Sequence, residues 1–142
     1  MKCREVMTDN PVCCLPNDFV SQSARVMRRE HIGAIPVVSD ERTKEIIGIV
    51  TDRDLAIKVV AESRDPNRTM VSDVMTHTIV VCREDDELSS AIAAIEEYQI
   101  RRIPVIDQGG RLVGIISQAD VHTLTREREM TAMRVKEISR AA

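Results

Sequence analysis

The stretch Gly48-Ile49-Val50-Thr51-Asp52-Arg53-Asp54 returns later in the chain as Gly114-Ile115-Ile116-Ser117-Gln118-Ala119-Asp120. Each copy is a glycine and a short apolar run, followed by a hydroxyl residue and, three positions later, an aspartate. Such an internal repeat indicates two copies of one supersecondary unit. Two copies are too few for a solenoid, so we expect the two units to pack on each other.

The sequence around this stretch repeats in the same order. Val6-Met7-Thr8 returns as Val74-Met75-Thr76, and Ile32-Gly33-Ala34-Ile35-Pro36-Val37 returns as Ile100-Arg101-Arg102-Ile103-Pro104-Val105. The repeat therefore covers nearly the whole chain. We divide it into a first unit, a second unit and a charged helical tail, at residues 1–66, 67–125 and 126–142.

Length and composition exclude several classes of protein. The 142 residues suit one compact body, and the apolar 43 % includes only one Phe, one Tyr and no Trp. The lack of aromatic side chains argues against single-stranded nucleic-acid binding, and a net charge of −3 with interspersed charges argues against a basic binding face. No apolar leader or membrane-length apolar run is visible, so we expect a cytoplasmic protein without a membrane or nucleic-acid partner.

The apolar patterns predict strand, helix, strand, strand and helix in each unit. Residues 1–11 are expected to be an extended lead-in, because Asn10 precedes a proline. In the first unit we expect a first helix capped by Asn17 and further elements at 12–15, 34–38, 46–50 and 51–64. In the second unit we expect a first helix capped by Asp85 and further elements at 78–82, 103–106, 112–116 and 117–139.

The predicted fold class is therefore α/β, with two β-α-β-β-α repeats packed around a pseudo-twofold axis. A single unit offers only a small sheet, and packing two units together buries both sheets. Equivalent loops of the two units then meet across a cleft, which is where we expect a ligand.

Two interpretations fit the pairs Thr51/Asp54 and Ser117/Asp120. A hydroxyl at the N-cap and an acid three residues later form a capping box, with Asp in place of the usual Glu or Gln. The same position also suits a ligand, because a helix N-terminus binds phosphate and a carboxylate one turn on can accept hydrogen bonds from ribose hydroxyls. The two interpretations are compatible, since a ligand can replace the water at a helix N-terminus.

The repeated blocks V-M-T, I-x-x-I-P-V and G-[IV]-[IV]-[TS]-x-x-D resemble the CBS repeat, named after cystathionine beta-synthase, whose tandem pair is called a Bateman module. The resemblance extends over residues 4–124 and implies a stand-alone CBS-domain pair. Members of this family bind adenosine-containing ligands such as AMP, ADP, ATP, S-adenosylmethionine or NAD in the cleft between the repeats. They commonly report energy or metabolite status to another protein or domain.

Carried over by position, the resemblance implies ligand contacts in both repeats. Thr51 and Ser117 resemble the family's phosphate-binding hydroxyls, and Asp54 and Asp120 its ribose-binding acids. Arg53 and Arg102 could add charge-assisted bonds to phosphate. The segments expected to surround the adenine are Asn10-Pro11-Val12, Ala34-Ile35-Pro36, Thr78-Ile79-Val80 and Arg102-Ile103-Pro104.

No other residues indicate catalysis, a metal site or an obligatory cofactor. The three histidines, His31, His77 and His122, lack metal-ligand spacing, and the acids at 84–87 lie where a helix start favours negative charge. Cys14 and Cys82 occupy equivalent strand positions and fit small buried residues. The vicinal pair Cys13-Cys14 leaves a redox switch or a metal site as an alternative.

We therefore expect a non-catalytic regulatory module that binds an adenosine-containing ligand, with AMP, ADP or ATP favoured. A homodimer is expected, formed through the helices that follow Thr51 and Ser117, with an unidentified effector protein as a further partner. One alternative is an interaction or scaffold dimer whose cleft binds no ligand. The other alternative is a thiol or metal sensor.

Overall fold

The computed structural model describes residues 1–141, with side chains for residues 1–133. Its elements are η1 (Cys3–Glu5), β1 (Thr8–Asp9), α1 (Val20–Glu30), β2 (Ala34–Val38), β3 (Ile46–Thr51), α2 (Asp52–Leu55), the π-helical turn η2 (Ala56–Val60), α3 (Val71–Val74), β4 (Cys82–Arg83), α4 (Leu88–Tyr98), β5 (Arg102–Ile106), β6 (Leu112–Ser117) and α5 (Gln118–Ala141). The predicted α/β class with two related repeats is confirmed.

The centre of each repeat is an antiparallel hairpin, β2–β3 in the first and β5–β6 in the second. Ile35 lies opposite Val50 in one hairpin, and Ile103 lies opposite Ile116 in the other. The predicted hairpin strands are therefore confirmed: β2 has the predicted bounds, and β3, β5 and β6 are each one residue longer at one end. The second hairpin turns through Gly110 at φ 84°, a backbone conformation that glycine adopts readily.

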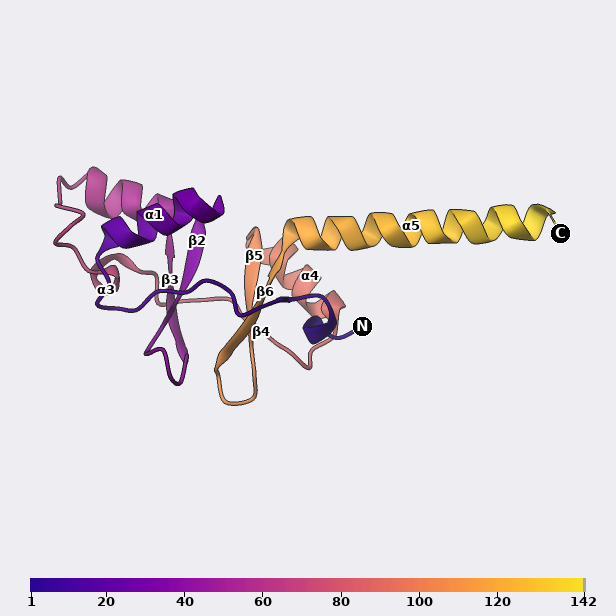
Figure 1. Ribbon diagram of the computed structural model, residues 1–142, viewed down its shortest axis with the longest axis horizontal. Helices are drawn as coiled ribbons and strands as arrows, with labels where there is room; N and C mark the ends of the chain where they lie inside the picture. The colour runs from indigo at the N-terminus through magenta and orange to yellow at the C-terminus, as the bar shows by residue number, and fades with distance from the viewer. Residues whose placement is uncertain (142) are drawn as a thin grey trace.

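The leading segment of each repeat pairs with the hairpin of the other repeat. Strand β1 is antiparallel to β6, with Thr8 opposite Ile115, whereas Thr76 bridges Ile49 of β3. Figure 1 shows the N-terminal segment beside β6 and α4, away from the first hairpin. The two repeats have therefore exchanged their leading segments.

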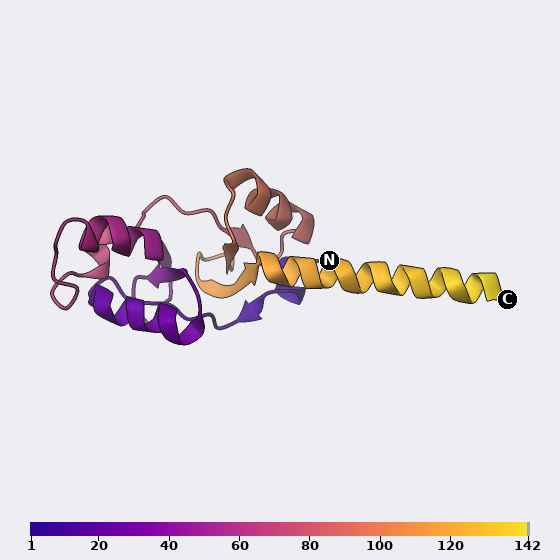
Figure 2. The ribbon, with the colours of Figure 1, turned by 90° about the horizontal axis from the view of Figure 1, so that it is seen from above.

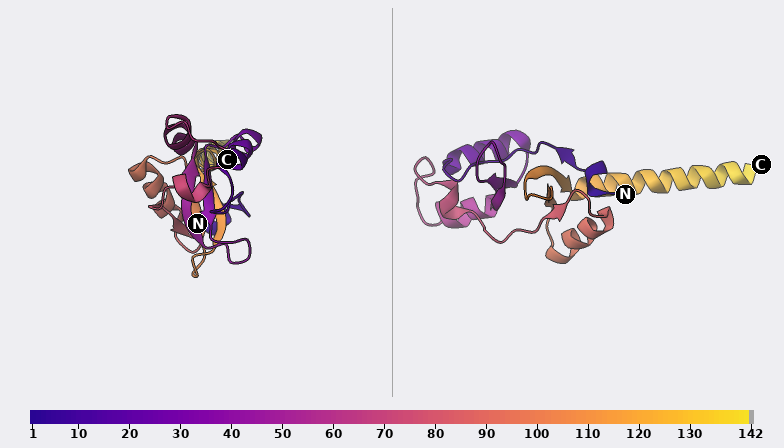
Figure 3. Two further views of the ribbon diagram at one scale, coloured as in Figure 1. Left: turned by 90° about the vertical axis from the view of Figure 1, so that its left-hand side faces the viewer. Right: turned by 90° about the horizontal axis from the view of Figure 1, so that it is seen from below.

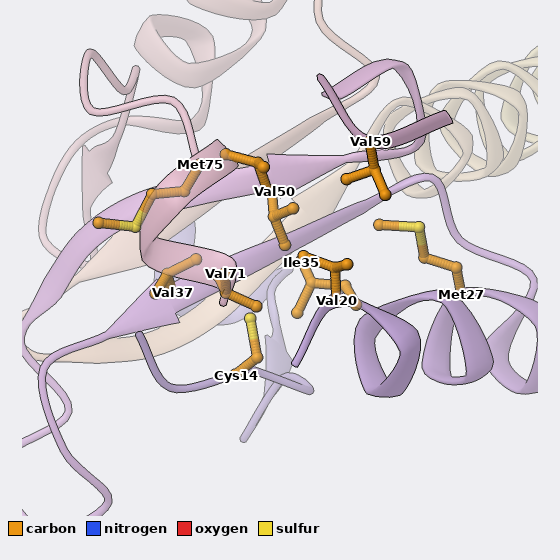
Figure 4. Packing of buried hydrophobic residues seen from close by; sticks show 10 residues of the cluster. Cys14, Val20, Met27, Ile35, Val37, Val50, Val59, Val71 and Met75 are labelled. Atoms are coloured by element: carbon orange, nitrogen blue, oxygen red, sulfur yellow. The ribbon is translucent and has the colours of Figure 1, made fainter. Parts of the chain in front are cut away.

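The hydrophobic cores follow the same exchange. The first core, part of which is seen in Figure 4, joins residues of α1 and β2–β3 to Val71, Val74 and Met75 from the start of the second repeat. The second core joins α4 and β5–β6 to Cys3, whose side chain is fully buried. The division of the chain at residues 66 and 67 stays a prediction, and both cores cross it.

Hydrogen bonds also join the two hairpins at their turns. The backbone N–H of Leu112 donates to the carbonyl oxygen of Lys44 at 2.9 Å, and that of Ile46 donates to Gly110 at 3.3 Å. Figures 2 and 3 show the two bodies side by side along the long axis, with α5 extending away from the first body. These hydrogen bonds hold the two repeats together at the turns of their hairpins.

Several predicted boundaries were wrong. Helix α1 begins at Val20 instead of near Asn17, because Gln22 accepts the Phe19 N–H at 3.0 Å and forms the cap from inside the helix. Helix α4 begins at Leu88, so Asp85 does not cap it. The expected lead-in contains η1 and β1, and the expected strands at 12–15 and 78–82 shrink to a single bridge at Cys14 and the short β4.

The last helix confirms the prediction and extends to Ala141. Its first turns pack on β6 and α4, through Val121 and Leu124. Met130 and Met133 are more than half exposed, and the predicted apolar position Ile138 lies outside the side chains that the structure describes. Within residues 1–141, none of the helices combines the length and the apolar character needed to cross a bilayer.

Candidate functional site

The two helix starts that follow β3 and β6 have the same capping geometry. The N–H of Asp54 donates to Thr51 Oγ1 at 3.0 Å, and the N–H of Thr51 donates back to Asp54 Oδ2 at 3.0 Å. In the second repeat the Asp120 N–H donates to Ser117 Oγ at 3.0 Å, and the Ser117 N–H donates to Asp120 Oδ2 at 3.1 Å. Both hydroxyl and aspartate pairs are therefore capping boxes.

Each helix start is also tied to the loop that precedes the first hairpin strand. The N–H of Asp52 donates to the carbonyl oxygen of Gly33 at 2.9 Å, and the N–H of Gln118 donates to Arg101 at 2.7 Å. The approach at Gly33 is close, because a Cβ atom there would lie 2.8 Å from a carboxylate oxygen of Asp52. These contacts bring distant segments of each repeat together at one edge.

Between these edges lies a cleft of about 1200 Å³ that both repeats line. From the first repeat come the loop before β2, the end of β3 and the start of α2. From the second come the segment before β4, the loop before β5 and the start of α5. The lining residues are His31, Gly33, Ala34, Ile49, Thr51, Asp52, Arg53, Thr78, Ile79, Val80, Gln99, Ile100, Arg101, Arg102, Pro104, Ser117, Gln118 and Ala119.

About half of the predicted site residues line this cleft. The lining residues among them are Ala34, Thr51, Arg53, Thr78, Val80, Arg102, Pro104 and Ser117. Ile35, Pro36 and Ile103 are buried in the hairpins and do not line the cleft. Asp54, Asp120, Asn10, Pro11 and Val12 are not among the residues that line it.

Sequence reasoning missed several lining residues. His31, Gly33, Gln99 and Ile100 lie in the loops just before β2 and β5, and the repeat itself was the available signal, because these loops are equivalent. Both His31 and Gln99 have positive φ, 56° and 51°, and end helices α1 and α4. Asp52, Gln118 and Ala119 lie between the hydroxyl residue and the aspartate, at positions where the two repeats differ, so the repeated pattern did not indicate a role for them.

The charges on the cleft are mostly positive. Arg53, Arg101 and Arg102 line it, and Asp52 is the only acidic lining residue in the part of the chain that the structure describes. Guanidinium groups form strong, often bidentate hydrogen bonds with phosphate and carboxylate groups. The cleft therefore favours a ligand that carries negative charge.

The carboxylate of Asp54 is buried and has several partners. Its Oδ1 lies 3.0 Å from Lys58 Nζ, and the Thr76 hydroxyl donates to it at 3.3 Å. Lys58 also donates to the carbonyl oxygen of Val74 at 2.8 Å. These bonds join the helix after β3 to the segment that leads into the second repeat.

The cysteines are free thiols, and three of them are buried. Burial raises the pKa of Cys14 to about 12, and it also raises the pKa of Cys3, Cys13 and Cys82 above the ordinary 9.0. Cys14 and Cys82 pack in equivalent positions of the two cores. Among the residues with described surroundings, no three His, Cys, Asp or Glu side chains gather as a metal site would require.

Comparison with known proteins shows where this arrangement recurs. The chain is 33 % identical over 118 residues to the uncharacterized protein MK0525 of Methanopyrus kandleri. The matched region covers 83 % of this chain and 57 % of that protein. The crystal structure of Hypoxic Response Protein I with two coordinated zinc ions has a TM-score of 0.77 and 31 % identity, over 87 % of this chain and 98 % of that chain.

A second solved structure contains nucleosides. The CBS domain pair of protein MJ0100, in complex with 5′-methylthioadenosine and S-adenosyl-L-methionine, has a TM-score of 0.75 and 25 % identity, over 90 % of this chain and 98 % of that chain. The family model described as CBS domain matches residues 3–61 and 71–125, once in each repeat. The chain therefore belongs to the CBS domain family, as a tandem pair of these domains.

Proposed function

We propose that the chain is a non-catalytic regulatory module that binds an adenosine-containing ligand in the cleft between its repeats. The observation that carries this proposal is the cleft itself, which is bordered by two hydroxyl-capped helix starts and three arginines. The likeness to the MJ0100 pair supports an adenosine ligand, since that structure contains two adenosine derivatives.

The chemistry of the lining suggests how such a ligand would be held. A phosphate or carboxylate group would lie at a helix start, near a hydroxyl and the guanidinium groups of the rim. The ribose would lie against the aspartate of the same helix start. The adenine would lie among small apolar residues, of which Ala34, Val80 and Pro104 line the cleft.

A ligand that touches both repeats can transmit a signal. It shifts the protein toward whichever packing of the repeats it binds better, and only a difference in affinity between two packings produces a shift. We propose that a cytoplasmic homodimer transmits this change to an effector protein. Ile57 and Val60, which are 47 % and 75 % exposed on the helix after Thr51, are its candidate contact residues.

Thermal unfolding of the full chain with AMP, ADP, ATP, NAD and S-adenosylmethionine tests the proposal. A ligand at about 100 times its Kd adds roughly 2.7 kcal/mol to the free energy of unfolding, which raises Tm by several degrees. Guanosine monophosphate is the matched control, because it has the same phosphate and ribose with another base. A rise with adenosine ligands alone supports the module proposed here.

The other outcomes point to the alternatives. No rise with any of the five ligands would favour a scaffold dimer. A response to zinc or to an oxidant that disappears in Cys13→Ser would favour a metal or thiol sensor, and zinc is included because Hypoxic Response Protein I was solved with zinc ions.

A further inference from the structure

The two repeats do not contribute equally to the cleft. All three second-repeat segments expected to surround a ligand line it, at 78–80, 102–104 and 117–119. Of the equivalent first-repeat segments, those near Ala34 and Thr51 line it, whereas Asn10-Pro11-Val12 does not. A ligand in this cleft therefore has a complete set of neighbours only on the second repeat.

The start of α2 has no backbone donor left for a ligand. The Asp52 N–H is bonded to Gly33, the Asp54 N–H is bonded to Thr51, and the Arg53 N–H between them donates to the carboxylate of Asp52 at 2.8 Å. That carboxylate lies where an incoming phosphate would need this N–H. It therefore both occupies the donor and repels an anion.

The start of α5 differs at the corresponding position. The Gln118 N–H is bonded to Arg101 and the Asp120 N–H to Ser117, as in the first repeat. The N–H of Ala119, which replaces Arg53, has no hydrogen-bond acceptor in the part of the chain that the structure describes. Gln118, which replaces Asp52, is neutral, so the Ala119 N–H is not occupied by a carboxylate of the preceding residue as the Arg53 N–H is.

The two aspartates also differ in how available their carboxylates are to a ligand. Asp54 is 7 % exposed and bonded to Lys58 and Thr76, so its carboxylate is already paired. Asp120 is only half-buried, and among the described residues its single partner is the N–H of Ser117. The residue equivalent to Lys58 is Leu124, which packs against the second core and has no charge to offer.

From these differences we infer that the module has one nucleotide site, built on Ser117, Ala119 and Asp120 of the second repeat. Asp54 is a structural carboxylate that ties the first repeat to the segment entering the second. Asp52 keeps anionic groups away from the start of α2. This inference rests on the proposed function and decides which half of the cleft performs it.

Titration calorimetry of the full chain tests the inference, with AMP as the anionic probe and 5′-methylthioadenosine as the uncharged one. We expect one site per chain for either probe. Ser117→Ala should raise the Kd for AMP about tenfold or more, because it removes the hydroxyl that would donate to phosphate. Asp120→Asn should raise the Kd for both probes about tenfold or more, because an NH2 group replaces one of the two oxygens that would accept from the ribose hydroxyls. Their matched counterparts Thr51→Ala and Asp54→Asn should change Kd by less than about threefold.

A substitution that gives the second repeat the lysine found in the first adds an independent test. Leu124→Lys places an ammonium group one turn from Asp120, where it can pair with the free carboxylate oxygen as Lys58 does with Asp54. We expect it to raise the Kd for AMP about tenfold. Leu124→Met retains the apolar contact and should leave Kd unchanged, and circular dichroism verifies that each variant folds.

The outcomes separate the inference from the proposed function. Two sites per chain would overturn the inference and leave the function intact, as would a loss of binding in Thr51→Ala but not in Ser117→Ala. No heat with either probe, together with no Tm change with any of the five adenosine ligands, would overturn both. If Asp54→Asn does not fold, Thr51→Ala decides alone, because it removes only a cap.

Discussion

The side chain of Met7 packs directly on the backbone of Gly114, and a Cβ atom at Gly114 would lie 2.7 Å from Met7 Cγ. The other repeat has the same contact, since a Cβ atom at Gly48 would lie 2.9 Å from Met75 Sδ. Met7 lies at the start of the first repeat but packs on the second, and Met75 lies near the start of the second but packs on the first. The repeated methionine and the repeated glycine are therefore two sides of one contact, made across the repeats.

Alanine at Gly48 should destabilise the protein. Its Cβ atom would lie 2.9 Å from the backbone oxygen of Thr76, which cannot move without disturbing the bridge to Ile49. We expect a loss of about 1–3 kcal/mol, the usual cost of overpacking, measured by urea denaturation. Gly109→Ala is the control, because a Cβ atom there would lie an ordinary 3.5 Å from a carboxylate oxygen of Asp107.

Gly114→Ala should also destabilise, but this loss should be recoverable. The atoms in its way belong to the side chain of Met7, so the double variant Met7→Ala/Gly114→Ala makes room for the added methyl group. We expect the double variant to be more stable than the sum of the two single losses predicts. Strict additivity of the two losses would contradict the contact.

Removal of residues 1–9 should destabilise the second repeat more than the first. The deletion removes β1 from the edge of β6 and removes buried Cys3 from the second core. Hydrogen exchange should show faster exchange of the amides in β6 and α4, with β2–β3 less affected. Uniform loss of protection would show that the two bodies unfold as one unit.

The two capping aspartates should differ in their contribution to stability. Asp120→Asn should cost no more than about 1 kcal/mol, because the amide oxygen can still accept the Ser117 N–H and only the negative charge at the helix start is lost. Asp54→Asn also breaks the pair with Lys58, whose side chain is 41 % exposed, so we expect a total near 2 kcal/mol after discounting for solvent screening. Chemical denaturation of both variants measures the difference, and equal losses would contradict the role given to Lys58.

The buried thiols should make the protein less stable at alkaline pH. Burial raises the pKa of Cys14 to about 12 in the folded protein, against 9.0 for an ordinary thiol, and raises that of Cys82 as well. Above about pH 9 the unfolded chain releases protons that the folded protein keeps, so stability is full below that pH and falls above it.

The expected slope is about 1.4 kcal/mol per pH unit for each such thiol, up to its folded pKa. Denaturation of wild type and Cys82→Ala between about pH 8 and about pH 10 measures it, and the variant should show the shallower fall. Comparing the two removes the contribution of other groups that titrate in this range. Parallel curves would contradict the prediction.

The proposed homodimer makes a prediction about the exposed apolar residues of η2. Val60 is 75 % exposed, so Val60→Asp should cost little in the stability of a single chain. It should nevertheless shift the protein to the monomer in sedimentation experiments, because it buries a charge in the interface. Glu41→Lys, in the exposed turn after β2, is the control, and an unchanged dimer would place the interface elsewhere.

Sequence alone was sufficient for the repeat, the hairpins and both capping boxes. These depend on local signals: alternating apolar residues in strands, glycines in a turn, and a hydroxyl three residues before an aspartate. It was less successful at helix starts, since Gln22 rather than Asn17 caps α1. Side-chain caps compete over distances of a few residues, and the sequence does not say which one forms.

Only the tertiary structure decided how the two copies are combined. The exchange of leading segments pairs Thr8 with Ile115 and Thr76 with Ile49, residues far apart in the chain, and no local pattern specifies such a partner. Likewise Thr51-x-x-Asp54 and Ser117-x-x-Asp120 read alike in the sequence. The contrast between Lys58 and Leu124, four residues after each aspartate, is visible in the sequence, but the bond from Thr76 to Asp54 and the burial of Asp54 are not, because they depend on a distant segment that the exchange brings to this helix start.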